Sequence, residues 1–238
     1  MIRRENYKNK FIPILQSKFN VDLQIIEEIE SKEGIIVTDG NKVYKCLTLL
    51  NEQQELISHS LNTNILSEEL TNLHKNFLET NQLIVHFFLN LKALSEDIKK
   101  HKIKTVINFE VFLIDKFIII VMPFVNVSEF NNANNQSIIS ILRDFKKIAW
   151  LSLDFEPKNV KQLNDSLIFL DIGFFFVPFY KKGFEIMCKR AYITSRFFNS
   201  DNLKTYLRKA ITEINFSFLP NNENHQEQFN TFYQEANK

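Results

Sequence analysis

Apolar residues in the first part of the chain change from helical to extended spacing. Residues 1–20 carry apolar side chains at the intervals of an amphipathic helix, which predicts a leading helix. Extended apolar runs at residues 23–26, 34–37 and 43–47 then predict three antiparallel strands. Asp39-Gly40-Asn41 lies between the second and third runs and is typical of a tight hairpin turn.

Helical spacing returns in the next segment and then gives way to a second pair of extended runs. Apolar stripes predict helices at residues 51–61, 66–77 and 83–98. The runs at residues 106–114 and 117–125 are joined by a short polar turn and predict two further strands. With the first three strands they would complete a five-stranded antiparallel sheet.

The second half of the chain is predicted to be mostly helical. The Asn-rich, polar stretch at residues 126–136 predicts a boundary, and residues 137–149 are amphipathic. Helices are predicted again at residues 181–198 and 201–214. The polar tail from residue 221 is expected to form a loosely packed final helix, anchored only by Phe229 and Phe232. The pattern as a whole predicts an α+β fold.

Composition narrows the class of protein without identifying a function. The chain has 238 residues, of which 45% are hydrophobic and 24% charged, as in folded globular proteins. The formal net charge of +1 favours neither nucleic acid nor an acidic membrane surface as a partner. The sequence shows no apolar run of membrane-spanning length, no signal-peptide core and only two cysteines, Cys46 and Cys188. We therefore expect a cytoplasmic protein without a transmembrane segment.

The candidate chemistry is concentrated in residues 151–178. Asp154 is followed five residues later by Asn159, and an apolar run after a short polar turn ends in Asp171-Ile172-Gly173. Carboxylate and amide oxygens on loops beside strands suit a metal-bound nucleotide, because hard cations prefer oxygen ligands. The alternative interpretation is a surface hairpin with acidic turns.

The order and spacing of these residues resemble the catalytic and metal loops of the protein-kinase-like superfamily, H-R-D-x-x-x-x-N followed by D-F-G. Residues 152–159 read Ser-Leu-Asp-Phe-Glu-Pro-Lys-Asn and residues 171–173 read Asp-Ile-Gly, so the acidic and amide positions match while the His, Arg and Phe do not. The resemblance implies a two-lobed protein-kinase-like fold. Its N-lobe, residues 1–125, would hold the five-stranded antiparallel sheet with helices, and residues 126–238 would form a short helical C-lobe.

The same resemblance implies roles for four side chains. Asp154 would orient and deprotonate an acceptor hydroxyl, and Asn159 and Asp171 would hold Mg²⁺. Lys45, in the middle of an apolar strand, would bind the α- and β-phosphates of ATP. A lysine at such a position is costly unless its ammonium is paired.

Other parts of the nucleotide site are assigned by the same resemblance. Glu69, or alternatively Glu55, would be the helix glutamate that pairs with the strand lysine. Gly34 would lie in the turn over the phosphates, although a chain with only 4 glycines contains no G-x-G-x-x-G loop. Pro123 has no amide hydrogen to donate, so the backbone contacts to adenine would begin at Phe124.

The resemblance predicts an ATP- and Mg²⁺-dependent kinase that transfers the γ-phosphate to a hydroxyl of a protein or of a sugar or lipid-linked acceptor. The short C-lobe, without an A-P-E activation segment, is similar to that of bacterial lipopolysaccharide and Kdo kinases and of minimal atypical Ser/Thr kinases. The alternative is a pseudokinase that binds nucleotide or acts as a scaffold, in keeping with the missing glycines and with Ser152-Leu153 in place of His-Arg. The motifs identify neither the acceptor nor the oligomeric state, because acceptor choice depends on the C-lobe surface.

Overall fold

The structure is a computed structural model. It describes residues 2–21, 27–29, 34–47, 83–114, 117–130, 135–173, 175–220 and 224–238. The helices predicted at residues 51–61 and 66–77 lie outside the described residues, and with them Glu55 and Glu69.

An antiparallel sheet forms the N-terminal half, with its strands in the order β1-β2-β3-β5-β4. The strands are β1 (Glu27–Ile29), β2 (Gly34–Thr38), β3 (Lys42–Leu47), β4 (Glu110–Ile114) and β5 (Phe117–Pro123). All four neighbouring pairs are antiparallel. The first predicted strand, at residues 23–26, lies outside the described residues.

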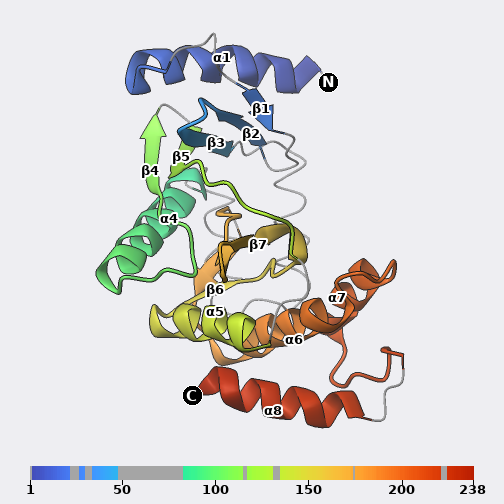
Figure 1. Cartoon of the computed structure of the whole chain (residues 1–238). Coiled ribbons are helices and arrows are strands. Elements are labelled where there is room, and N and C mark those ends of the chain that lie inside the picture. Colours follow the sequence, from blue (N-terminus) through green and yellow to red (C-terminus); the bar gives the residue numbers. More distant parts are fainter. Residues whose placement is uncertain are drawn as a thin grey trace.

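The long helix α1 (Ile2–Phe19) covers one face of this sheet (Figure 1). Its Phe11 and Leu15 are fully buried and pack in one core cluster with Tyr44 and Cys46 of β3. Successive side chains of a strand point to opposite faces. Residues 44 and 46 therefore face α1, while residues 45 and 47 face the rest of the chain.

The opposite face of the sheet belongs to a larger core that continues into the C-terminal half. Leu47 and Ile120 are part of this core, together with the apolar face of α4 (Leu83–Lys100). The indole Nε1 of Trp150 donates a hydrogen bond of 2.9 Å to Asp97 of α4, which joins that helix to the second half of the chain.

The apolar run at residues 106–114 is predicted as a single strand, but only its second half joins the sheet. β4 begins at Glu110, and the backbone before it bonds to the C-terminal half. The Ile107 N–H donates to the Phe169 carbonyl (3.0 Å), and the Phe169 N–H donates to the Thr105 carbonyl (2.8 Å). Buried backbone groups must be paired, and here the partner is a strand of the other half.

The C-terminal half combines helices with two short antiparallel strand pairs, β6 with β9 and β7 with β8. Its elements are α5 (Asn135–Lys147), β6 (Trp150–Ser152), the 3-10 turn Pro157–Asn159, β7 (Val160–Leu163), β8 (Ser166–Phe169), β9 (Phe176–Pro178), α6 (Lys181–Phe197), α7 (Leu203–Thr212) and α8 (His225–Asn237). Helices combined with antiparallel sheets are what the sequence predicts at the level of fold class.

The expectation of a loosely packed final helix is wrong. Phe229 and Phe232 of α8 are each 4% exposed, and Ala236 is fully buried. Glu235 accepts an ion-pair hydrogen bond of 3.2 Å from Arg143 of α5. The two predicted anchors therefore belong to a narrow apolar stripe, and α8 packs against α5 and α6. Figure 1 shows α8 beside these two helices.

Among the described residues, no helix combines the length and the apolar character needed to cross a membrane.

Candidate active site

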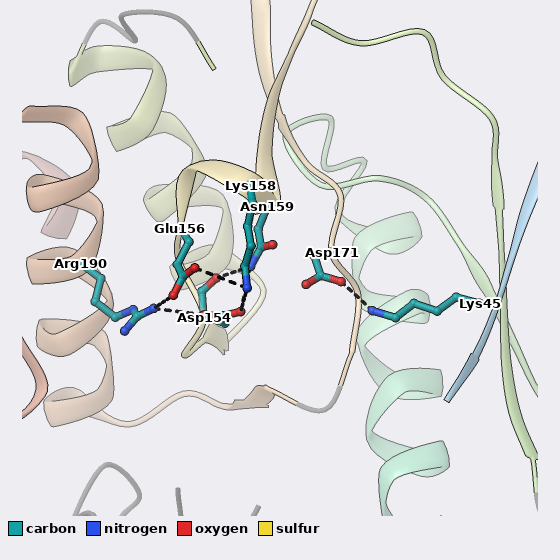
Figure 2. A network of polar contacts seen from close by, with 7 residues as sticks. All are labelled: Lys45, Asp154, Glu156, Lys158, Asn159, Asp171 and Arg190. Atoms are coloured by element: carbon teal, nitrogen blue, oxygen red, sulfur yellow. Dashed lines mark hydrogen bonds and ion pairs between the residues drawn. The ribbon is translucent and has the colours of Figure 1, made fainter. Parts of the chain in front are cut away.

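Lys45 and Asp171 meet between the sheet and the C-terminal half. The Lys45 side chain is 2% exposed, and its Nζ lies 2.6 Å from Oδ1 of Asp171 (Figure 2). Strand alternation explains the direction of Lys45, because its neighbours Tyr44 and Cys46 face α1. A buried ammonium requires a partner of opposite charge. Asp171, 126 residues further along the chain, supplies one.

Asp171 lies on the loop that follows β8, and backbone hydrogen bonds hold that loop against the turn at Asn159. The Leu170 N–H donates to the Asn159 carbonyl (2.9 Å), and the Ile172 N–H donates to the Leu170 carbonyl (3.0 Å). The Asp171 side chain keeps 28% of its surface exposed. The two loops predicted to carry the chemistry are therefore adjacent.

Asp154 and Asn159 lie on one short turn after β6. Pro157 opens the 3-10 turn Pro157–Asn159, where its fixed φ suits the first position. The Asn159 Nδ2 donates to the backbone carbonyl of Asp154 (2.7 Å) and to its Oδ2 (3.0 Å). With its amide nitrogen held there, Asn159 presents its amide oxygen on the side of Asp171 (Figure 2).

Cations surround the Asp154 carboxylate. Nη2 of Arg190, on α6, lies 3.1 Å from Oδ1, and Nζ of Lys158 lies 3.4 Å from Oδ2. Burial by itself would raise the pKa of Asp154. The charges of Arg190 and Lys158, with the hydrogen bond from Asn159, outweigh burial and hold that pKa below its usual value.

Glu156 belongs to the same network (Figure 2). Its Oε1 lies 3.0 Å from Nη2 of Arg190, and its Oε2 lies 3.4 Å from Nζ of Lys158. Burial would lower the pKa of Lys158, but the carboxylates of Asp154 and Glu156 raise it. The loop therefore carries two carboxylates, each paired with the same two cations.

Sequence reasoning did not place Arg190 beside Asp154. It interpreted the Lys189-Arg190 pair as a basic rim for an anionic acceptor or as a solvated helix face. Arg190 lies 36 residues after Asp154, in a helix that begins after the motif. No spacing rule connects these two residues. One signal was present, a Lys189-Arg190 pair inside an otherwise apolar helical stretch. Both side chains are buried, and a buried cation implies a carboxylate or carbonyl partner.

Two further residues predicted to contact the nucleotide, Gly34 and Phe124, are among the described residues. Gly34 begins β2, where it pairs with Leu47 of β3. Phe124 follows β5 and is 46% exposed, but its N–H donates to the Asn41 carbonyl (2.8 Å). The amide expected to meet adenine therefore already has an acceptor within the protein.

Asn159 and Asp171 fit a magnesium ion. An amide oxygen and a carboxylate on adjacent loops form a partial set of hard oxygen ligands, which Mg²⁺ completes with water and substrate phosphates. Within the described ranges, no group of three or more His, Cys, Asp and Glu side chains could hold a metal ion by itself. The donor set therefore suits a metal that arrives with a phosphate ligand better than a permanent structural metal.

Comparison with known proteins gives partial structural similarity and no sequence match. No protein-family model matches the sequence, and no curated protein sequence matches it either. Among solved structures, the chain is similar to the Legionella pneumophila Lpg2603 kinase bound to IP6, with a TM-score of 0.42 and 14% identity. The similarity covers 87% of this chain and 66% of that kinase chain. A similarity of this size assigns no family, ligand or activity to the present chain.

Proposed function

We propose that this protein is an ATP- and Mg²⁺-dependent phosphotransferase with a protein-kinase-like, two-lobed arrangement. The contact between Lys45 and Asp171 is the observation that carries the proposal. It brings a buried strand lysine onto the D-x-G loop, and that loop is bonded to the turn that holds Asp154 and Asn159. A cation for phosphate, oxygen ligands for a metal and a carboxylate for a hydroxyl then lie in one region.

In this proposal the strand lysine binds phosphate and the D-x-G aspartate binds the metal. Nucleotide binding would separate the present ion pair, because the Lys45 ammonium would turn to the α- and β-phosphates. Asp171 and Asn159 would hold Mg²⁺. The ion, when bound, neutralises charge on the phosphate oxygens. Lys45 would thereby exchange the Asp171 carboxylate for phosphate, and Asp171 would exchange the Lys45 ammonium for Mg²⁺.

Asp154 would orient the acceptor hydroxyl for in-line transfer. A bond forms between the hydroxyl oxygen and the γ-phosphorus while the bond to the β–γ bridging oxygen breaks, and ADP leaves with that electron pair. The hydroxyl proton passes to Asp154 and then to solvent. Because the pKa of Asp154 is held low, this carboxylate is a weak base. Its contribution is therefore orientation, with proton transfer late in the reaction.

The acceptor class that we propose is a hydroxyl of a protein or of a sugar or lipid-linked molecule. A pseudokinase is the second candidate, and two observations favour it. Both carboxylate oxygens of Asp154 are already bound by cations or an amide, and the Phe124 N–H is bonded internally. A protein with these features could bind nucleotide without transferring phosphate.

Calorimetric titration of ATP, with and without Mg²⁺, tests the nucleotide site. The variants are Asp171→Ala and, as a matched control, Asp165→Ala, which changes an exposed aspartate in the turn between β7 and β8. We expect ATP binding that depends on Mg²⁺ in the wild type and in Asp165→Ala. In Asp171→Ala the Mg²⁺ dependence should be lost. A thermal shift gives a second readout, because ATP at 100 times its Kd stabilises a folded protein by about 2.7 kcal/mol.

Three other outcomes would count against the proposal. Binding that ignores Mg²⁺ and survives Asp171→Ala would support the pseudokinase. Mg²⁺-dependent binding without phosphate transfer, even to water, would support it as well. No binding of ATP in the wild type would reject the phosphotransferase and a nucleotide-binding pseudokinase, and would leave only a scaffold.

A further inference from the structure

Arg190 connects three separate segments of the C-terminal half. Its side chain is 6% exposed and belongs to α6. Its Nη2 lies 3.1 Å from Oδ1 of Asp154 and 3.0 Å from Oε1 of Glu156, and its Nη1 donates to the Leu207 carbonyl of α7 (3.2 Å). One guanidinium therefore contacts the loop after β6 and α7 from the middle of α6.

The loop carboxylates determine how this guanidinium is oriented. Its Nε is buried and has no hydrogen-bond acceptor among the described residues. A buried donor without an acceptor is uncommon and requires an explanation, because it costs free energy. Here Nη2 of Arg190 donates to the carboxylates of Asp154 and Glu156, while Nε is left without an acceptor. Arg190 is thus placed for Asp154 and Glu156 rather than for the packing of its own helix.

A guanidinium also determines the orientation of the carboxylate that it contacts, because its donors lie in a fixed plane. Arg190 takes Oδ1 of Asp154, which leaves Oδ2 to Asn159 and Lys158. Figure 2 shows Arg190 on the side of Asp154 away from Asp171 and Lys45. Its position therefore does not coincide with the place proposed for the phosphates.

We propose that Arg190 is the positioning residue of the transfer site. It holds the Asp154 carboxylate in the orientation that meets the acceptor hydroxyl, with Glu156 as its second anchor on the same loop. Arg190 contacts neither the nucleotide nor the acceptor. This inference rests on the proposed phosphotransfer. Leu153 stands where the H-R-D motif has an Arg, and Arg190 supplies a guanidinium to Asp154 from α6 instead.

The test separates nucleotide affinity from turnover. We would measure the Kd of Mg·ATP and the rate of γ-phosphate transfer to water at saturating Mg·ATP, for Arg190→Gln and Arg190→Lys. We expect the Kd to stay within about twofold while turnover in Arg190→Gln falls by about tenfold to a hundredfold, the range for a misplaced catalytic group. Arg190→Lys should recover part of the loss, because an ammonium keeps the charge but not the planar geometry.

Arg196→Gln is the matched control. It removes a guanidinium from the exposed end of the same helix, where Arg196 lies over the Tyr192 ring and not beside the loop. Both Kd and turnover should be unchanged. Glu156→Gln provides an independent variant, because it removes the second anchor and keeps the contact between Arg190 and Asp154. We expect a smaller fall in turnover, again at unchanged Kd.

The outcomes that overturn the inference are distinct from those that overturn the proposed function. Wild-type turnover in folded Arg190→Gln and Arg190→Lys would show that Arg190 has no positioning role. A parallel loss of Mg·ATP binding would show that it supports the whole site instead. If Arg190→Gln does not give a cooperative unfolding transition, Arg190→Lys and Glu156→Gln decide. A wild type that neither binds nor hydrolyses ATP would reject the phosphotransfer on which the inference rests.

Discussion

At the scale of single residues, the turn between β2 and β3 shows how one carboxylate organises its surroundings. Asp39 Oδ1 accepts the N–H groups of Asn41 (2.9 Å) and Lys42 (2.7 Å), and Oδ2 accepts the Tyr44 hydroxyl (3.0 Å). Burial would raise the pKa of Asp39, but these hydrogen bonds outweigh burial and lower it. They also place β3, and with it Lys45, in register.

We expect Asp39→Asn to lower the free energy of unfolding by about 1 kcal/mol at neutral pH, the typical contribution of such hydrogen bonds. The folded-state pKa of Asp39 lies below its unfolded-state value of about 3.9. The contribution of the ionised group is therefore present above that value and is lost as the pH falls through the folded pKa. Urea unfolding at a series of pH values should show the wild type and the variant converging at acid pH.

The control for this comparison is Asp165→Asn, in the exposed turn between β7 and β8. It should change the free energy of unfolding by less than about 0.5 kcal/mol. A stability difference between wild type and Asp39→Asn that stays constant down to acid pH would contradict the role given to the Asp39 charge.

Local spacing made the residue-scale site partly predictable. Asp154 and Asn159 are close in sequence, so their shared turn follows from short-range geometry. To predict that Lys45 and Asp171 lie close together required both the alternation of side chains along the strand and the resemblance to the kinase motifs. Arg190 could not be predicted, because a contact across 36 residues depends on how α6 packs and leaves no periodic trace in the sequence.

At the scale of elements, the first turn of α6 lies very close to β6. A Cβ added to Gly183 would come within 2.7 Å of the Leu151 side chain and closer still to the Tyr180 ring. Gly183 and Leu151 are both buried. The glycine is therefore required for close approach of the helix to the strand, and that approach brings the middle of α6 to the loop after β6.

Gly183→Ala should lower the free energy of unfolding by about 1–3 kcal/mol, the usual cost of overpacking. The sign of this change in the free energy of unfolding is informative, because alanine in a helix is otherwise favoured over glycine by about 1 kcal/mol. Denaturant unfolding would measure it, with Lys182→Ala at the exposed neighbouring position as a control. A Gly183→Ala variant as stable as the wild type would show that Leu151 and Tyr180 yield without cost.

Apolar periodicity predicted that most of the described helices and strands exist. It did not predict which other elements each of them pairs with or packs against. The run at residues 106–114 is apolar throughout, and a strand with one partner cannot be distinguished by pattern from a strand that changes partners. Ile107 bonds to Phe169, whereas Glu110 begins the sheet. Similarly, Phe229 and Phe232 were recognised as anchors of α8, but two aromatic residues in a polar tail are too weak a periodic signal to predict how tightly the helix packs.

At the scale of the whole molecule, the backbone bonds of Ile107 and Phe169 join the two halves. Ile107 is 3% exposed and Phe169 is fully buried. Amides in such positions open only in the global unfolding reaction. We expect hydrogen exchange to show both amides among the slowest in the chain, with protection equal to the global free energy of unfolding. Ile214, which is 89% exposed, serves as a rapidly exchanging reference.

Rapid exchange at Ile107 and Phe169 under conditions where the core of α6 stays protected would contradict this expectation. It would mean that the halves separate before either one unfolds. The proposed lobe boundary between residues 125 and 126 would then be a boundary of stability as well as of sequence.

The same two hydrogen bonds restrict how the halves can rotate relative to each other. A rotation that keeps both bonds intact has its axis near Phe169, so displacements are small close to that residue and increase with distance from it. Asp171 lies two residues beyond Phe169, whereas Lys45 belongs to β3 of the sheet. A ligand that enters between them would therefore displace the lysine with the sheet, while the aspartate would remain almost stationary.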